Sequence, residues 1–325
     1  MSAEVLVGVD IGGTKTAIVL AKDPQAVLTR IAFPTTPKLG PEPAIAAIIV
    51  SIRKALLTQQ FNPSDVKAIG VSCGGPLDPV KGLIQEPPNL PGWKDIPITS
   101  ILEKEFGVPC YLENDANAGA LAEHKFGAGQ GTRNLIFLTM GTGLGAGLIL
   151  NGSLYRGTTF LAGEVGHVRL TETGPVGFNK AGSVEGWASG GGMAILAREA
   201  VAAAKRAGRQ TLLANIEQAE ISARDVWHVA QQGDEVACNI VATAGNKLGH
   251  AAAILVDLFN PEMIAIGGLA LRMGDAVLEP ARAIVRAEAI PAAAEACRIV
   301  PAALGEQIGD VAALCIAMEG LANGK

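Results

Sequence analysis

The stretch Asp10-Ile11-Gly12-Gly13-Thr14-Lys15-Thr16 lies between two apolar runs, Val5–Val9 and Ala17–Leu20. Two strand-like runs joined by a glycine-rich turn predict a β-hairpin. Glycines let a ligand approach the backbone, and successive N–H groups in such a turn form a concave anion site. A carboxylate at the rim can hold phosphate-bound Mg²⁺ through water. The turn therefore predicts a nucleotide-phosphate site made of Asp10, Gly12, Gly13, Thr14 and Lys15. An ordinary tight hairpin is the alternative, because short glycine motifs often carry no function.

The same pattern occurs a second time. The runs Leu135–Thr139 and Ala146–Leu150 flank Met140-Gly141-Thr142-Gly143-Leu144-Gly145. Two such hairpins predict two similar lobes that hold a nucleotide between them, with Gly141, Thr142, Gly143 and Gly145 at the phosphates. A third glycine pair, Gly267-Gly268, follows the buried-strand pattern Met263–Ile266 and is predicted to close the nucleotide site from another side.

Composition indicates a folded protein with two cores. The chain has 325 residues, of which 49% are apolar and 18% charged, and this length suits two domains. A net charge of −5 without a Lys/Arg stripe argues against a nucleic-acid surface. No uninterrupted apolar stretch reaches the roughly 18 residues of a membrane span, and the N-terminus has no basic region followed by an apolar one. We therefore expect no nucleic-acid partner, no membrane association and no secretion signal.

The cysteines favour a reducing compartment. The five are scattered and include no Cys-x-x-Cys pair: Cys73, Cys110, Cys238, Cys297 and Cys315. This pattern supports neither a disulfide framework nor a thiolate zinc site. We interpret all five as small buried side chains and expect a cytoplasmic protein.

The order of strand and helix patterns predicts an α/β fold with mixed sheets flanked by helices and a ligand cleft between two lobes. The predicted N-terminal lobe covers residues 1–115 and the C-terminal lobe 116–308, while a last helix over 309–325 returns to the first lobe. Strands are expected at 32–35, 66–72 and 108–112. Helices are expected at 41–60, 98–106, 188–207, 222–232, 234–258 and 275–289.

Asp115 is the candidate general base. It follows a buried-type strand and precedes an alanine-rich helix, and strand ends of this kind line the ligand crevice of α/β sheets. A carboxylate there can accept the proton of a hydroxyl that attacks phosphorus. The alternative is that Asn114 or Asp115 only caps the helix. Capping does not use all the polar residues in Glu113-Asn114-Asp115-Ala116-Asn117.

A second polar cluster is Gly163-Glu164-Val165-Gly166-His167. A Glu and a His three residues apart in a bent loop can bind vicinal hydroxyls, and Glu185 is near in sequence. A lone His is more often structural, but the glycine context favours a polyol site. We predict that Asn89, in a proline-rich loop, is a further carbohydrate contact and that the Trp93 ring lines the same site.

Four of these motifs, in this order, resemble those of the ROK family of bacterial sugar kinases and repressors, in the superfamily of hexokinase and actin. The motifs are Asp10–Lys15, Glu113–Asn117, Gly141–Gly145 and Gly163–His167. The resemblance covers about residues 5 to 320. It implies two actin-like (ribonuclease H-like) lobes, transfer of the γ-phosphate of Mg-ATP to the 6-hydroxyl of a hexose such as glucose, Asp115 as base, and a homodimer. It places sugar hydroxyls at Gly75, Asn89, Asn114, Glu164, His167 and Glu185. It places phosphates at the two hairpin turns and adenosine at Gly267-Gly268.

One departure from the family pattern concerns a metal. The resemblance implies a structural zinc held by the His of the Gly-Glu-x-Gly-His motif and three cysteines, but this chain reads Val176-Gly177-Phe178-Asn179-Lys180-Ala181-Gly182-Ser183 there. Zinc requires thiolate or imidazole ligands. We therefore expect no structural zinc. Without it, either another group orients His167 or the sugar contact of His167 is looser.

Three alternatives to an ATP-dependent kinase stay open. Family repressors carry a winged-helix segment before the first hairpin, whereas Asp10 lies ten residues from the start of this sequence. A sugar-binding sensor without activity is opposed by Asp115 and both turns. A polyphosphate-dependent kinase would favour a basic groove, which this acidic chain does not suggest.

Overall fold

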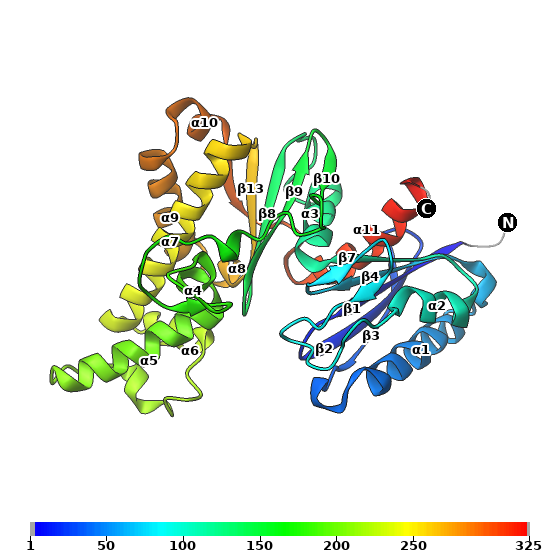
Figure 1. Ribbon diagram of the computed structural model, residues 1–325, viewed down its shortest axis with the longest axis horizontal. Coiled ribbons are helices and arrows are strands. Elements are labelled where there is room, and N and C mark those ends of the chain that lie inside the picture. Colours follow the sequence, from blue (N-terminus) through cyan, green and yellow to red (C-terminus); the bar gives the residue numbers. More distant parts are fainter. Residues whose placement is uncertain (1–3, 324–325) are drawn as a thin grey trace. The chain divides into compact units, whose positions relative to one another are not determined.

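Two five-stranded mixed sheets organise the computed structural model, which describes residues 4–323 (Figure 1). One compact unit consists of the chain up to Gln130, Leu154–Ala162 and the chain from Glu306 onward. The other consists of Gly131–Ser153 and Gly163–Gly305. The predicted α/β class with mixed sheets is confirmed.

The sheet of the first unit has the strand order β3-β2-β1-β4-β7. Its strands are β1 (Val5–Ile11), β2 (Lys15–Ala21), β3 (Val27–Pro34), β4 (Val66–Cys73) and β7 (Cys110–Asn114). β1 and β2 form the predicted antiparallel hairpin, whereas β4 lies parallel to both β1 and β7. Asp10 lies opposite Ser72, and Ser72 opposite Glu113, so the carboxyl ends of three parallel strands meet at one edge.

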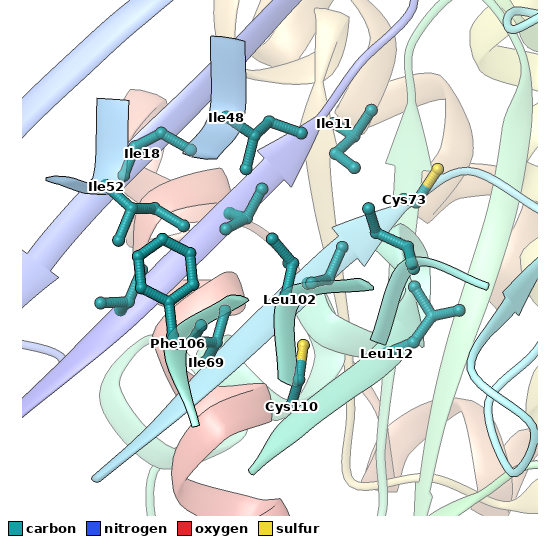
Figure 2. Packing of buried hydrophobic residues seen from close by; sticks show 14 of the residues in the cluster. Ile11, Ile18, Ile48, Ile52, Ile69, Cys73, Leu102, Phe106, Cys110 and Leu112 are labelled. Carbon is teal, nitrogen blue, oxygen red and sulfur yellow. The ribbon is translucent and has the colours of Figure 1, made fainter. Parts of the chain in front are cut away.

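Two helices cover one face of this sheet, α1 (Pro41–Thr58) and α2 (Ile98–Phe106). Ile48 and Ile52 of α1 and Leu102 of α2 are fully buried against the strands, as Figure 2 shows. Full burial of one such side chain contributes about 1.5–3 kcal/mol. These apolar positions recur at helical spacing, which is why the sequence predicted both helices.

The opposite face is covered by α11 (Ile308–Asn323), which packs on β1 and β4 and against α3 (Asp115–Phe126). The approach is close at Gly70, where a Cβ would come within 2.1 Å of the carbonyl oxygen of Ala313. Because α3 packs on α11, the first unit continues to Gln130 rather than ending at the predicted 115.

The sheet of the second unit repeats the plan of the first, with the order β10-β9-β8-β13-β14. Its strands are β8 (Leu135–Met140), β9 (Leu144–Leu150), β10 (Ser153–Tyr155), β13 (Met263–Gly268) and β14 (Arg298–Pro301). β8 and β9 form an antiparallel hairpin, and β13 lies parallel to β8 and β14. The glycine-rich turn thus joins the corresponding hairpin strands in each sheet.

The helices of the second unit centre on α7, which packs against α4, α5, α6 and α9. The bounds are α4 (Val184–Ala188), α5 (Gly190–Arg206), α6 (Ala223–Ala230), α7 (Glu235–Phe259), α8 (Leu269–Met273), α9 (Asp275–Glu288) and α10 (Pro291–Ala296). Two short antiparallel pairs complete the chain: β5 (Leu77–Asp78) with β6 (Leu83–Ile84), and β11 (Val176–Gly177) with β12 (Lys180–Ala181).

All five cysteines are free thiols, and four are buried as predicted. Cys238 is exposed, because it lies near the start of α7 on the side that faces solvent. Within residues 4–323, every helix is too short or too polar to cross a bilayer.

Candidate active site

Asp115 is the first residue of α3, directly after β7. One of its carboxylate oxygens, Oδ1, accepts the N–H of Ala116 at 2.8 Å. Asn114 is the helix cap, because its Oδ1 accepts the N–H groups of Ala116 and Asn117. The side chain of Asp115 is open to solvent, yet surrounding protein displaces enough water to raise the pKa of this carboxyl above its ordinary value. A carboxylate that favours its protonated form is a better proton acceptor.

A buried ion pair lies beneath this helix start. Glu113 is 3% exposed, and its Oε1 accepts the N–H of Asn114 and the side-chain amide of Asn117, both at 3.0 Å. Its Oε2 accepts from Nε of Arg156 at 2.6 Å. This pair fixes the residues on both sides of Asp115, and sequence reasoning did not find Arg156.

The first glycine-rich turn is closed by a hydrogen bond from Gly12 N–H to Lys15 C=O at 3.0 Å. Thr35 holds the turn twice: its hydroxyl donates to Gly12 C=O at 2.6 Å, and its N–H donates to Thr14 C=O at 3.2 Å. No acceptor within the described chain takes the N–H groups of Gly13 and Thr14. These donors fit the predicted anion site.

Asp10 stands at the same edge, at the end of β1. Burial raises the pKa of Asp10 to about 7, and the carboxylates of Asp115 and Asp310 act in the same direction. The carboxylate lies against Gly309 in the first turn of α11, where a Cβ would come within 2.5 Å of Asp10 Oδ2. Crowded carboxylates of this kind favour a bound cation. Among residues 4–323, however, no group of three or more His, Cys, Asp or Glu side chains can hold a metal.

Three predicted sugar contacts of the first unit lie together. A Cβ on Gly75 would lie 3.2 Å from Asn114 Nδ2, and a Cβ on Gly74 would lie 3.4 Å from Asn89 Oδ1. Asn89 is exposed and also touches Gly13. The expectation for Trp93 is wrong: it is fully buried in the core below the loop and cannot form a wall for a ligand.

The second glycine-rich turn has its own support. Gly141 N–H donates to Gly143 C=O at 3.0 Å, while the N–H groups of Thr142 and Gly143 meet no acceptor within the described residues. Gly145 lies in β9 opposite Thr139, so it belongs to the strand ladder rather than to the tip of the turn. Beside the turn, Gly267 pairs with Thr139 and Gly268 with Met140.

Glu164, His167 and Glu185 come together in the second unit. Glu164 precedes the single 3₁₀ turn Val165–His167, and His167 is the last residue of that turn. The turn contacts α4, the helix that carries Glu185. The ring of His167 meets the ring of Phe178 edge-on with centroids 5.6 Å apart, and Lys180 Nζ donates to His167 C=O at 2.8 Å. The β11–β12 hairpin, where the resemblance implies a zinc loop, thus contacts His167. The absence of zinc stays a prediction.

A cavity of about 220 Å³ lies at Leu269, the residue that follows Gly268. It is lined by Ala223, Arg224, Trp227, Leu269, Arg272 and Met273. An indole and guanidinium groups offer stacking surfaces to a flat ring. Sequence reasoning found the neighbouring glycine pair but none of the lining residues.

Comparison with known proteins identifies the family. The model of the ROK family matches residues 6–319. The chain belongs to the ROK family. A glucokinase of Halalkalibacterium halodurans is 33% identical to this ROK protein over 95% of this chain and 93% of its own length.

A solved structure agrees. The ROK glucokinase of Streptomyces griseus, in complex with glucose and AMPPNP, has a TM-score of 0.79 and 31% identity, covering 97% of this chain and all of its own. The predicted actin-like fold is confirmed, and this ROK protein is a sugar kinase. A putative xylose repressor of Caldicellulosiruptor is also similar, at 32% identity over 76% of this chain but 62% of its own length.

Proposed function

We propose that this sugar kinase transfers the γ-phosphate of ATP, bound with Mg²⁺, to the 6-hydroxyl of a hexose, with D-glucose as the first candidate. The observation that carries the proposal is the position of Asp115. Its carboxylate stands at the edge where three parallel strands end, has one oxygen held by Ala116 N–H, and has a raised pKa. The glucokinase relatives supply the substrate class.

Asp115 would act as the general base. Apart from the N–H groups of Ala116 and of Asp115 itself, no group among the described residues donates to this carboxylate, so it is available to take the proton of the attacking hydroxyl. Asn114 uses its oxygen as the helix cap, which leaves its Nδ2 to donate to a sugar oxygen. A positioned base contributes about 10²- to 10⁴-fold to the rate.

The two glycine-rich turns would bind the phosphates through backbone N–H groups, those of Gly13 and Thr14 in one unit and those of Thr142 and Gly143 in the other. Mg²⁺ usually takes one or two carboxylates together with water and phosphate oxygens. Asp10, whose charged form is disfavoured by burial and by neighbouring carboxylates, fits that role. The metal supplies positive charge to the phosphates when bound.

The remaining roles follow from position. Gly75 and Asn89 of the first unit, and Glu164, His167 and Glu185 of the second, would bind sugar hydroxyls. The adenine ring would lie in the cavity that Trp227 and Arg272 line beside Gly268. Substitution of Trp227 by Ala should therefore raise the KM for ATP more than the KM for the sugar.

The test is ADP release by purified protein with Mg²⁺, ATP and a panel of hexoses that includes D-glucose, D-fructose and N-acetylmannosamine. Saturable ADP release with one hexose supports the proposal and names the substrate. Inorganic polyphosphate replaces ATP in a parallel set of reactions. Transfer from polyphosphate alone would contradict ATP as the donor.

A non-catalytic sugar sensor is the second candidate, because a xylose repressor shares 32% identity over three quarters of this chain. Calorimetry separates it from a kinase. A sensor binds sugar without releasing ADP from ATP, whereas the kinase shows both binding and turnover.

A further inference from the structure

The carboxylate of Glu185 lies directly beneath the second glycine-rich turn. Its Oε2 accepts the N–H of Leu144 at 3.1 Å. The same oxygen would lie only 2.7 Å from a Cβ placed on Gly143, so a side chain at that position would displace the carboxylate. A side chain predicted to bind sugar therefore holds the turn predicted to bind phosphate.

The segment that follows Glu185 holds the rest of that turn. Gly190 N–H donates to Gly141 C=O at 2.8 Å, and Gly191 N–H donates to Thr142 C=O at 3.0 Å. Ser189 connects the two contacts to α4, because its N–H donates to Glu185 C=O at 3.0 Å. The continuous segment from Glu185 to Gly191 thus holds the backbone of the turn at Gly141, Thr142 and Leu144.

On its other side Glu185 packs against the loop that carries His167. Its Cβ would lie 3.3 Å from a Cβ on Gly166, and the latter would clash with Leu144 C=O at 2.1 Å. The loop is also joined to β9 by a hydrogen bond from Ala146 N–H to Gly163 C=O at 2.8 Å. The backbone of Leu144, which belongs to the turn, therefore contacts both Glu185 and the loop Gly163–His167.

We propose that Glu185 couples sugar binding to nucleotide binding within the second unit. A carboxylate can accept hydrogen bonds at both oxygens. Leu144 N–H donates to Oε2. No group among residues 4–323 donates to Oε1, so Oε1 can accept a hydrogen bond from a sugar hydroxyl. A hydroxyl bound there immobilises the side chain, which in turn orders Leu144 and Gly143. The phosphates then bind a turn that is already ordered, so each ligand tightens the other. This inference rests on the proposed function and adds a mechanism to it.

Three variants separate coupling from simple support. Glu185→Gln keeps the size of the side chain but offers one acceptor oxygen instead of two and no charge, so the sugar and Leu144 N–H compete for it. His167→Asn is the matched control, because it changes a predicted sugar contact whose side chain makes no hydrogen bond to the turn. The wild-type protein completes the set.

Calorimetry measures the Kd for D-glucose with and without Mg²⁺ and AMPPNP. We expect the nucleotide to tighten glucose binding at least 5-fold in the wild type, within the usual range of coupling between two sites. In Glu185→Gln the ratio should fall below 2-fold. In His167→Asn both Kd values should rise while their ratio stays at the wild-type value. An unchanged ratio in Glu185→Gln, or a ratio of 1 in the wild type, overturns the inference.

A second measurement needs no variant. Hydrogen exchange of residues 141–145 is compared with and without D-glucose, in the absence of nucleotide. Slower exchange at Leu144 with the sugar supports coupling, and no change contradicts it. Absence of ATP-dependent phosphorylation of glucose by the wild type would instead refute the proposed function for this sugar, and the inference with it. An active enzyme without coupling refutes only the inference.

Discussion

Arg156 donates from Nε to Oε2 of Glu113 across 2.6 Å, and Glu113 in turn holds the backbone at Asn114. The Glu113 side chain is 4% exposed and the Arg156 side chain 35%. A segment that follows the second hairpin in sequence thereby neutralises the buried charge beside the candidate base.

Arg156→Met should destabilise the protein, because it leaves the Glu113 carboxylate buried without its counter-charge. Loss of one partner of a buried pair costs about 3–5 kcal/mol, and the partial exposure of Arg156 places the expected loss near the lower end. Urea unfolding measures it. The double variant Arg156→Met with Glu113→Gln should recover most of the loss. Additive losses in the double variant would show that the two side chains do not interact.

Gly309→Ala tests the contact between α11 and Asp10. Replacing Gly by Ala inside a helix normally raises the free energy of unfolding by about 0.5–1 kcal/mol. Here the added Cβ would come within 2.5 Å of the Asp10 carboxylate and displace it, so we expect higher KM for ATP and no gain in stability. In an Asp10→Ala background the same substitution should show the normal gain. If Gly309→Ala alone stabilises the protein, the contact between α11 and the Asp10 carboxylate does not require glycine at position 309.

Stability should depend on pH through Asp10. Its pKa is raised to about 7 in the folded protein, whereas an unfolded Asp titrates near 4. The folded state therefore binds more protons between these values, and the free energy of unfolding should fall as the pH rises from about 4 to 7. Asp115, whose pKa is also raised, adds to the same slope. Urea unfolding at several pH values should show a shallower slope in Asp10→Asn, and an identical slope would contradict the assignment.

Thr35→Val removes the hydroxyl that donates to Gly12 C=O at 2.6 Å and that also lies within hydrogen-bond distance of the Thr16 hydroxyl, at 2.9 Å. This threonine is 3% exposed, and loss of each buried hydrogen bond costs about 1–3 kcal/mol. Because the first turn loosens, the KM for ATP should rise several-fold while the KM for the sugar changes less. Thr58→Val is the control, since that hydroxyl donates to Lys54 C=O at an exposed position in the last turn of α1. Equal effects of both substitutions on the KM for ATP would contradict a role of Thr35 in the phosphate site.

Local sequence signals predicted much of the fold. The hairpin at Asp10–Thr16 and the helix over Ile98–Phe106 carry their own turn and periodicity signals, and the structure has both. β14 was not predicted, because Arg298–Pro301 is short and pairs only with the distant β13. The boundary at 115 differed because packing of α3 on α11 joins residues far apart in sequence.

The candidate site was predictable where a motif carries it. Asn114, Asp115 and Glu185 could be selected from short polar motifs. Thr35 and Arg156 could not, because each acts on a partner more than 20 residues away. The dual contact of Glu185 with Leu144 also needed coordinates. Homodimer formation and a cytoplasmic location stay predictions.

The most direct test of the central claim is Asp115→Asn, compared with the wild type for both sugar binding and phosphoryl transfer. Calorimetry gives the Kd for the hexose that the panel selects, and ADP release gives kcat with saturating Mg²⁺ and ATP. We predict that kcat falls about 10²- to 10⁴-fold while the Kd changes less than about threefold, since the amide keeps the shape of the carboxylate. Turnover close to that of the wild type would contradict Asp115 as the base.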